Sequence, residues 1–339
     1  MKRFLAWVVL ALVAGCGGTQ EPETSPRTGP APAYEVHEWG VITATAAGTD
    51  VTAGPPREFV QMVVEKPVLY FHTPEALAIQ LEVLPGPGFE AREHYPPTRG
   101  LHWSARLSPE GCVGQHRYLT DCAAPDGICE VRELSGYETR DGACLEVGGE
   151  RMPLLFYRLA ATRPIALPVA VNVSGDLVRA HATRGEISGF RMALVDGEVR
   201  AAAVTLGQTW QPLPTPSESW VHAAEALNVA LREAGLTGAE RAAFQRAWWR
   251  ELFGAAPPSA SSEPEDAMEE AFPGTEHQED QEVEQQVPLE EAERMVRGEP
   301  VLDVLFYMLP ADEVERVAHI AATPAPSRVS RAFLVRHVL

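Results

Sequence analysis

Lysine, basic clusters and long apolar runs are scarce in this chain. Lys2 and Lys66 are the only lysines, and acidic residues outnumber Lys and Arg by 47 to 28. Binding to nucleic acid needs basic side chains that offset the phosphate charge, so the sequence excludes a nucleic-acid partner. After the first residues, no apolar run approaches the ~20 residues of a membrane-spanning helix.

Motifs of well-known catalytic sites are also missing. The chain has no G-x-S-x-G, no H-E-x-x-H, no P-loop and no C-x-x-C pair. These patterns mark nucleophile elbows, zinc sites, phosphate loops and redox or metal-binding cysteines. No catalytic residue, no metal ligand and no cofactor therefore follows from a motif, and the sequence leans away from an enzyme.

The first residues have the three parts of an export signal. Lys2 and Arg3 precede an apolar run from Phe4 to Ala14, and Gly15 and Cys16 follow. A charged start, a short apolar stretch and small residues at the cut are typical of a signal peptide. The sequence L-V-A-G-C that ends at Cys16 resembles the lipobox of bacterial lipoproteins, which implies a lipid on this cysteine.

We therefore expect a signal peptide at 1–15, a lipid anchor on Cys16 and a flexible, proline-rich tether at 16–33. Each buried methylene of an acyl chain contributes about 0.8 kcal/mol, and lipoproteins carry more than one chain, so the anchor would hold the protein on a cell-envelope membrane. No aspartate directly follows Cys16, which favours the outer membrane, on its periplasmic or surface face, over the inner membrane.

Four further cysteines are clustered in one stretch, as Cys112, Cys122, Cys129 and Cys144. An even, clustered count in an exported chain predicts two disulfides, and three pairings remain open. A zinc site is the alternative, but zinc knuckles usually contain a C-x-x-C pair. The residues between the cysteines are rich in Gly, Asp and Pro, so we expect a loop-rich insertion at 112–144 that disulfides stabilise.

Another stretch is strongly acidic. Between Ser259 and Glu299 there are fourteen acidic residues, opposed only by Arg294 and Arg297. Its few apolar residues cannot offset the entropy lost on ordering, so we expect a disordered insertion at 255–299. A short helix within it, or weak binding of cations or a partner, are alternatives to a plain linker.

The expected folded body comprises residues 34–254 and 300–339. Apolar and polar residues alternate along 77–83 and 165–173, with the period of a half-buried strand. Asp-Gly between two apolar runs is typical of a tight hairpin. The pattern predicts a mainly β, sandwich-like body of one or two β subdomains, or an α+β fold if helices are counted. Other apolar stretches that predict strands are 68–71, 101–107, 154–157, 190–195, 199–206, 301–309 and 329–338.

Residues 218–253 predict a helical hairpin inserted in this body. Apolar residues step by three and four along 220–234 and again along 244–252, which gives each helix one apolar stripe. Thr237 and Glu240 form a capping box at the start of the second helix. We expect the two helices to lie antiparallel and to dock on the sheet.

The string His37-Glu38-Trp39 is the most unusual local sequence and the first candidate for a functional role. His and Glu can bind metals or act as acid and base. Neighbours in a strand point to opposite faces, however, so both would not easily serve one site. The structural alternative, which we favour, is that Trp39 anchors the core and His37 makes a fixed hydrogen bond.

The same string begins a resemblance that covers most of the chain. H-E-W-G-V-I-T at 37–43 resembles the H-E-W-G-T-F-T opening of a family of uncharacterised, often exported bacterial proteins. Val41-Ile42 departs from the family's Thr-Phe, and His72 stands where an aromatic residue is commoner. The family has no established activity, so the resemblance assigns no catalytic residue. The likeness continues at 65–71, 101–103, 154–158, 235–236, around 248, and at 305–310.

Two functions of different classes remain open. The first is a non-enzymatic envelope module that binds a protein, a glycan or a cell-wall component, and the sequence favours it because no catalytic set is recognisable. The second is an envelope hydrolase assisted by a metal on histidines of the β body, such as His37, His72 and His94. His102 also lies in an expected strand, but no spacing requires these residues to meet.

Overall fold

The computed structural model describes residues 33–46, 60–113, 116, 118, 121–122, 134–163, 165–174, 177–253 and 303–339. The expected signal peptide, Cys16, the tether up to residue 32 and the acidic insertion at 255–299 lie outside the described residues. The described strands form three sheets, accompanied by three α-helices. The protein is α+β with a mostly β body, as the sequence predicts.

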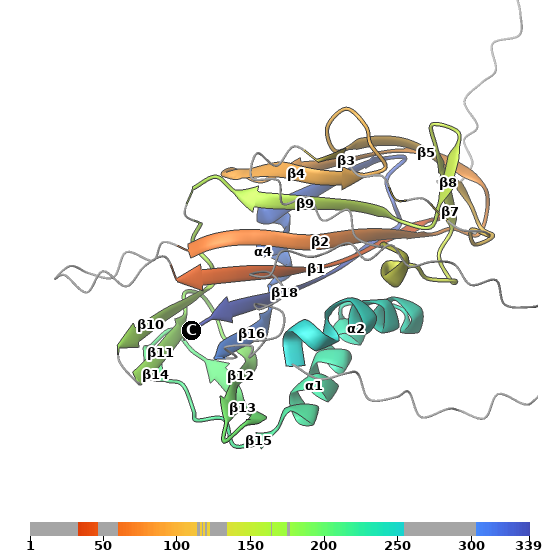
Figure 1. The fold of residues 1–339 in the computed structure, drawn as a ribbon. Coiled ribbons are helices and arrows are strands. Elements are labelled where there is room, and N and C mark those ends of the chain that lie inside the picture. The colour runs from red at the N-terminus through yellow and green to blue at the C-terminus, as the bar shows by residue number, and fades with distance from the viewer. Residues whose placement is uncertain are drawn as a thin grey trace, which may run out of the picture. The chain divides into compact units, whose positions relative to one another are not determined.

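The largest sheet has ten strands, and β1 and β18 lie side by side within it (Figure 1). These two strands run parallel, whereas the other pairs in the sheet are antiparallel. The order is β15 (Glu218–Ser219), β13 (Glu198–Leu206), β12 (Ile187–Val195), β16 (Val304–Met308), β18 (Arg328–Val338), β1 (Glu35–Ala46), β2 (Val60–His72), β9 (Leu155–Ala161), β4 (Phe89–Tyr95) and β6 (Asp121–Cys122).

Two smaller sheets complete the body. One has the order β17 (Ala318–Thr323), β3 (Leu77–Pro85), β5 (His102–Ser108), β7 (Cys144–Val147) and β8 (Glu150–Met152). The other has the order β10 (Val169–Ser174), β11 (Leu177–Ala182) and β14 (Gln211–Pro212). Along β3, Ile79, Leu81 and Val83 are buried while their neighbours are exposed, which confirms the predicted alternation.

The strand expected at 165–173 is shorter than its sequence pattern suggests. The chain joins the sheet only at Val169, one residue after Pro168, which has no amide hydrogen to donate to a neighbouring strand. Leu167 is nevertheless buried. Burial of an apolar side chain therefore does not require that its backbone belongs to a sheet.

The expected helical hairpin consists of α1 (Trp220–Glu233) and α2 (Gly238–Phe253). Gly235 follows α1 with φ +95°, the left-handed conformation that commonly ends a helix. α2 covers one face of the large sheet, where the ring of Phe244 packs edge-on against Trp39 of β1 at 5.3 Å between centroids. None of the described helices is long and apolar enough to cross a membrane.

The prediction of strands alone at 300–339 is wrong, because a third helix lies within this range. α4 (Ala311–Val317) follows Pro310 and carries Asp312 and Glu313 in its first turn. Acidic side chains there interact favourably with the positive end of the helix dipole. It packs on the face of the large sheet opposite to α2. This is the face to which Arg331 of β18 points, and Arg331 donates to Glu315 of α4 there. Seven residues are too few for a clear helical period.

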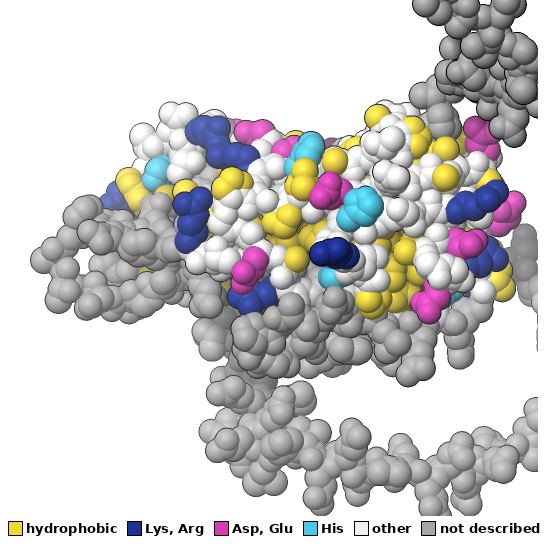
Figure 2. Space-filling model, turned by 90° about the horizontal axis from the view of Figure 1, so that it is seen from above, with side chains coloured by type: hydrophobic (Ala, Val, Ile, Leu, Met, Phe, Trp, Pro, Cys, Tyr) yellow, Lys and Arg dark blue, Asp and Glu magenta, His cyan; other side chains and the backbone are white. Residues whose placement is uncertain are grey.

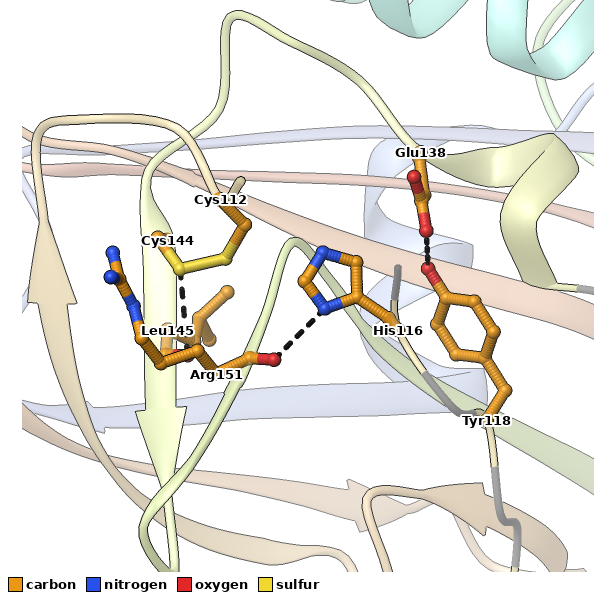
Figure 3. The surroundings of a disulfide bond; sticks show 7 residues. All are labelled: Cys112, His116, Tyr118, Glu138, Cys144, Leu145 and Arg151. Carbon is orange, nitrogen blue, oxygen red and sulfur yellow. Dashed lines mark hydrogen bonds between the residues drawn. A yellow bond between two sulfur atoms is a disulfide. The ribbon is translucent and has the colours of Figure 1, made fainter. Parts of the chain in front are cut away.

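The stretch 112–144 combines a disulfide with core-forming residues. Cys112 and Cys144 are bonded, with their Cα atoms 4.7 Å apart (Figure 3). Cys129 and the side chain of Cys122 lie outside the described residues, so the second expected disulfide stays a prediction. The stretch is more than a loop, because the short 3-10 helix Leu134–Tyr137 places its first and last side chains in the core.

The Cys112–Cys144 disulfide should stabilise the protein appreciably. It closes a loop over a sequence separation of 32 residues, for which the chain-entropy relation gives about 3–4 kcal/mol. Replacing both cysteines with alanine is expected to lower the free energy of unfolding in urea by that amount. Peptide mapping without reductant checks the pairing, and a fragment that links Cys112 to Cys122 or Cys129 would contradict it.

Candidate functional site

β1 and β2 bring two of the candidate histidines together. In their antiparallel register Glu35 lies opposite His72, and His37 follows Glu35 by two residues. Paired residues and residues two apart in a strand share a face, so all three side chains project from the same side of the sheet. The rings of His37 and His72 are 4.5 Å apart between centroids.

The carboxylate of Glu240 joins these two histidines from α2. Its Oε2 lies 2.9 Å from Nδ1 of His37, and its Oε1 lies 2.9 Å from Nε2 of His72. The predicted capping box is confirmed: the amide of Thr237 donates to Oε2 at 2.8 Å, and the amide of Glu240 donates to Thr237 Oγ1 at 3.2 Å. One side chain therefore both caps the helix and binds the two imidazoles.

Burial and hydrogen bonding set the charge of this cluster. Glu240 is fully buried. Burial alone raises the pKa of its carboxyl, but the hydrogen bonds from His37 and His72 outweigh burial and bring the pKa to about 2. The hydrogen bond to Glu240 raises the pKa of His72, and burial opposes this effect. The Glu240 carboxylate is thus ionised at neutral pH and favours cations beside it.

The outer ring nitrogen of His37 has a partner of its own. Nε2 of His37 lies 3.2 Å from Oε2 of Glu35. Histidines that bind metals usually donate the second N–H to a carboxylate or a backbone carbonyl in this way. Glu35 thus orients the ring of His37 so that its Nδ1 points at Glu240.

His37, His72 and Glu240 therefore form a candidate metal centre. One ligand atom from each residue can be chosen so that all three lie within 4.8 Å of one another. Two imidazoles and one carboxylate are a ligand set of catalytic zinc sites and of non-haem iron sites. Here a metal would take the place of the hydrogen bonds and release the protons that the histidines share with Glu240.

A cavity of about 260 Å³ adjoins the cluster at His72. Its wall near Asp141 and Ala143 is held in place, because the amide of Ala143 donates to the carbonyl of Phe71 at 2.7 Å and Cys144 is bonded to Cys112. A small ligand in this cavity would contact the candidate metal centre at His72. The lining residues are Ala33, Glu35, His72, Thr73, Pro74, Pro109, Asp141, Ala143 and Ser327.

Glu38 lies on the opposite face of the sheet from His37, as the period of a strand predicts. It is fully buried, and Arg331 donates to it from Nε at 2.5 Å. The hydroxyl of Tyr157 donates to the same carboxylate. Glu38 is therefore part of a buried ion pair and does not join the metal centre.

His94, the third histidine named for the alternative function, does not lie with His37 and His72. In the register of β4 with β9 it lies opposite Tyr157, which places it on the Glu38 face of the sheet. Its Nε2 contacts the backbone of Thr98, and its ring packs edge-on near Trp103. The sheet itself separates it from the cluster, and His102 is exposed on β5.

Trp39 is completely buried and packs against aromatic side chains, which is the core role favoured for it from the sequence. A second cavity of about 300 Å³ lies between the helical hairpin and strands β12, β13 and β16. No Asp, Glu, His, Lys or Arg lines it, and its hydroxyl groups are those of Ser188, Thr205 and Tyr307. It lacks the imidazole and carboxylate groups that the cluster of His37, His72 and Glu240 brings together.

Charge on the surface is mixed in the view from above. Figure 2 shows acidic, basic and histidine side chains interspersed with apolar ones on this face, without a broad patch of one sign. Comparison with known proteins adds no assignment, because no protein-family model, no curated protein and no solved structure matches the chain. The geometry of the site is thus the guide to its function.

Proposed function

We propose that the protein is a metal-dependent hydrolase of the cell envelope, with Zn²⁺ held by His37, His72 and Glu240. The observation that carries this proposal is the convergence of two imidazole nitrogens and one buried carboxylate beside a cavity. His37 and Glu240 are 203 residues apart in the chain, so their meeting reflects the tertiary fold and not local helix or strand geometry.

The arrangement suits hydrolysis in three respects. Three protein ligands leave a coordination position for water, as in catalytic zinc sites. A bound zinc ion would lower the pKa of that water and polarise a carbonyl oxygen. Glu240 supplies one negative charge to offset the metal, Glu35 orients His37, and the cavity next to His72 admits the substrate.

The location of this activity also belongs to the proposal. An export signal at 1–15, a lipid on Cys16 and a tether at 16–33 would hold the enzyme on an envelope membrane, with the outer membrane favoured. The resemblance of residues 37–43 to the H-E-W-G-T-F-T family supports export and leaves the reaction open. Both features come from the sequence alone.

Metal analysis of the purified full chain tests the proposal. We expect about one Zn²⁺ per chain, and we expect a chelator to remove it and lower the melting temperature. A ligand present at 100 times its dissociation constant stabilises by about 2.7 kcal/mol, which corresponds to several degrees in a domain of this size.

Two variants make the test specific. His72→Ala should lose the metal, with a fall in affinity greater than the roughly 10–100-fold effect of removing an outer partner. His102→Ala, which removes an exposed histidine of β5, should keep it. A wild-type chain without metal, whose melting temperature a chelator does not change, would contradict the proposal and favour a non-enzymatic binding module.

A further inference from the structure

We infer that the cavity beside the cluster selects a substrate with a protonated amine next to the carbonyl group that is cleaved, such as the N-terminal residue of a peptide. This inference rests on the proposed metal centre and names its substrate class. It comes from the side chains that line the cavity, which include Glu35 and Asp141 and no lysine or arginine.

The two carboxylates are available to a ligand. Glu35 contacts the imidazole of His37 through one oxygen, and 40 % of its side chain is exposed. Asp141 is exposed, and its charge acts on His72. Within the described residues, no arginine or lysine forms an ion pair with either carboxylate.

The two hydroxyl groups of the lining are already used. Thr73 Oγ1 donates to the carbonyl of Glu75 at 2.7 Å, and Ser327 Oγ donates to the carbonyl of Tyr34 at 2.8 Å. The remaining lining side chains are alanines and prolines apart from His72. The strongest groups left to recognise a ligand are therefore the two negatively charged carboxylates, which accept hydrogen bonds.

This charge pattern discriminates between substrate classes. Phosphate or carboxylate groups would meet two like charges, whereas an ammonium group would form charge-assisted hydrogen bonds to them. His72 lines the same cavity as the carboxylates and pairs with Glu35 across β1 and β2, so an ammonium bound to them would leave the adjacent carbonyl close to the proposed metal position. At about 260 Å³ the cavity is at the small end of ligand sites, which suits a single amino-acid residue.

The reaction needs no partner besides water. The water oxygen bonds to the carbonyl carbon, the carbon–nitrogen bond of the amide breaks, and the departing nitrogen takes both protons of the water. The products are a carboxylate and a new ammonium group, and nothing is oxidised or reduced. The ammonium group of the substrate is unchanged and serves only for recognition.

A matched pair of zinc-binding probes tests the inference. Alanine hydroxamate and N-acetylalanine hydroxamate share the metal-binding group, but only the first has a protonated amine. Calorimetric titration of the zinc-loaded full chain should show at least about tenfold tighter binding of alanine hydroxamate, the effect expected for a charge-assisted contact. Added salt should reduce this preference, because the carboxylates are partly exposed.

Variants separate this inference from the proposed function. Glu35→Gln with Asp141→Asn should bring the two probes to nearly equal affinity, whereas Glu146→Gln on the exposed side of β7 should preserve the preference. Equal affinities in the wild-type zinc protein, or no binding of either probe, would overturn the inference while the metal centre stands. Absence of zinc from the wild-type chain would overturn both.

Discussion

Replacing Arg331 with methionine is expected to destabilise the protein by about 3–5 kcal/mol, because it leaves the Glu38 carboxylate buried without its cation. Arg331 also donates to Glu315 at 2.9 Å and to the carbonyl of Ala318 at 2.6 Å. The side chain thus connects β1, β18 and α4 through one guanidinium group. Urea unfolding of the variant and the wild type measures the loss.

A double variant shows how much of this loss comes from the ion pair. Arg331→Met combined with Glu38→Gln removes both charges and leaves an oxygen that can accept from Tyr157, so it should be less destabilised than Arg331→Met alone. The matched control is Arg106→Met, at an exposed position of β5, which should change stability by less than about 0.5 kcal/mol. A double variant that loses the sum of the single effects would argue against coupling.

Glu240→Ala should remove both the metal and a large part of the stability. The change leaves the amide of Thr237 and the rings of His37 and His72 without their shared acceptor. Each buried group without a partner costs about 1–3 kcal/mol, so we expect a loss of at least about 3 kcal/mol. Thermal unfolding and metal analysis of the same sample measure the two effects together.

Glu240→Gln separates the two roles of this residue. The amide oxygen of glutamine can still accept from Thr237, so the cap should persist, but a neutral amide is a poor replacement for a carboxylate ligand. We expect a smaller loss of stability with full loss of zinc. Glu225→Ala, at an exposed position of α1, is the control and should change neither quantity. Retention of zinc by Glu240→Gln would exclude this carboxylate as a ligand.

The parts of the fold that the sequence predicts are those with local causes. The alternation of β3 follows from side chains two residues apart, and the hairpin at Asp196-Gly197 from two residues that accept positive φ, 52° and 79°. The capping box of Thr237 and Glu240 spans three residues. In each case the interacting groups are close in the chain, so a single sequence contains the whole signal.

The candidate site could be predicted only in part, because its residues meet through strand register. His37 is singled out by its unusual neighbours, but its approach to His72 depends on the pairing of Glu35 with His72. The position of His94 depends on two further pairings, β2 with β9 and β9 with β4, and each contains a bulge. A bulge shifts the side chains that follow it, and the alternation of one strand does not reveal it.

The capping signal of Glu240 concealed its second role. A Glu three residues after a Thr at a helix start is fully explained by the cap, so nothing in the local sequence points to another function. Only the docking of α2 on the sheet brings the same carboxylate to two histidines. A residue whose identity is already accounted for by a helix cap can therefore still belong to a functional site.

The parallel pairing of β1 with β18 has a consequence for the kinetics of folding. The two strands lie near opposite ends of the described chain, so this central contact has a very large sequence separation. Contacts of this kind slow folding. Until β18 pairs with β1 and β16, each of these strands has an unpaired edge. Self-association between chains thus competes most strongly with folding after β1 has formed and before β18 pairs with it.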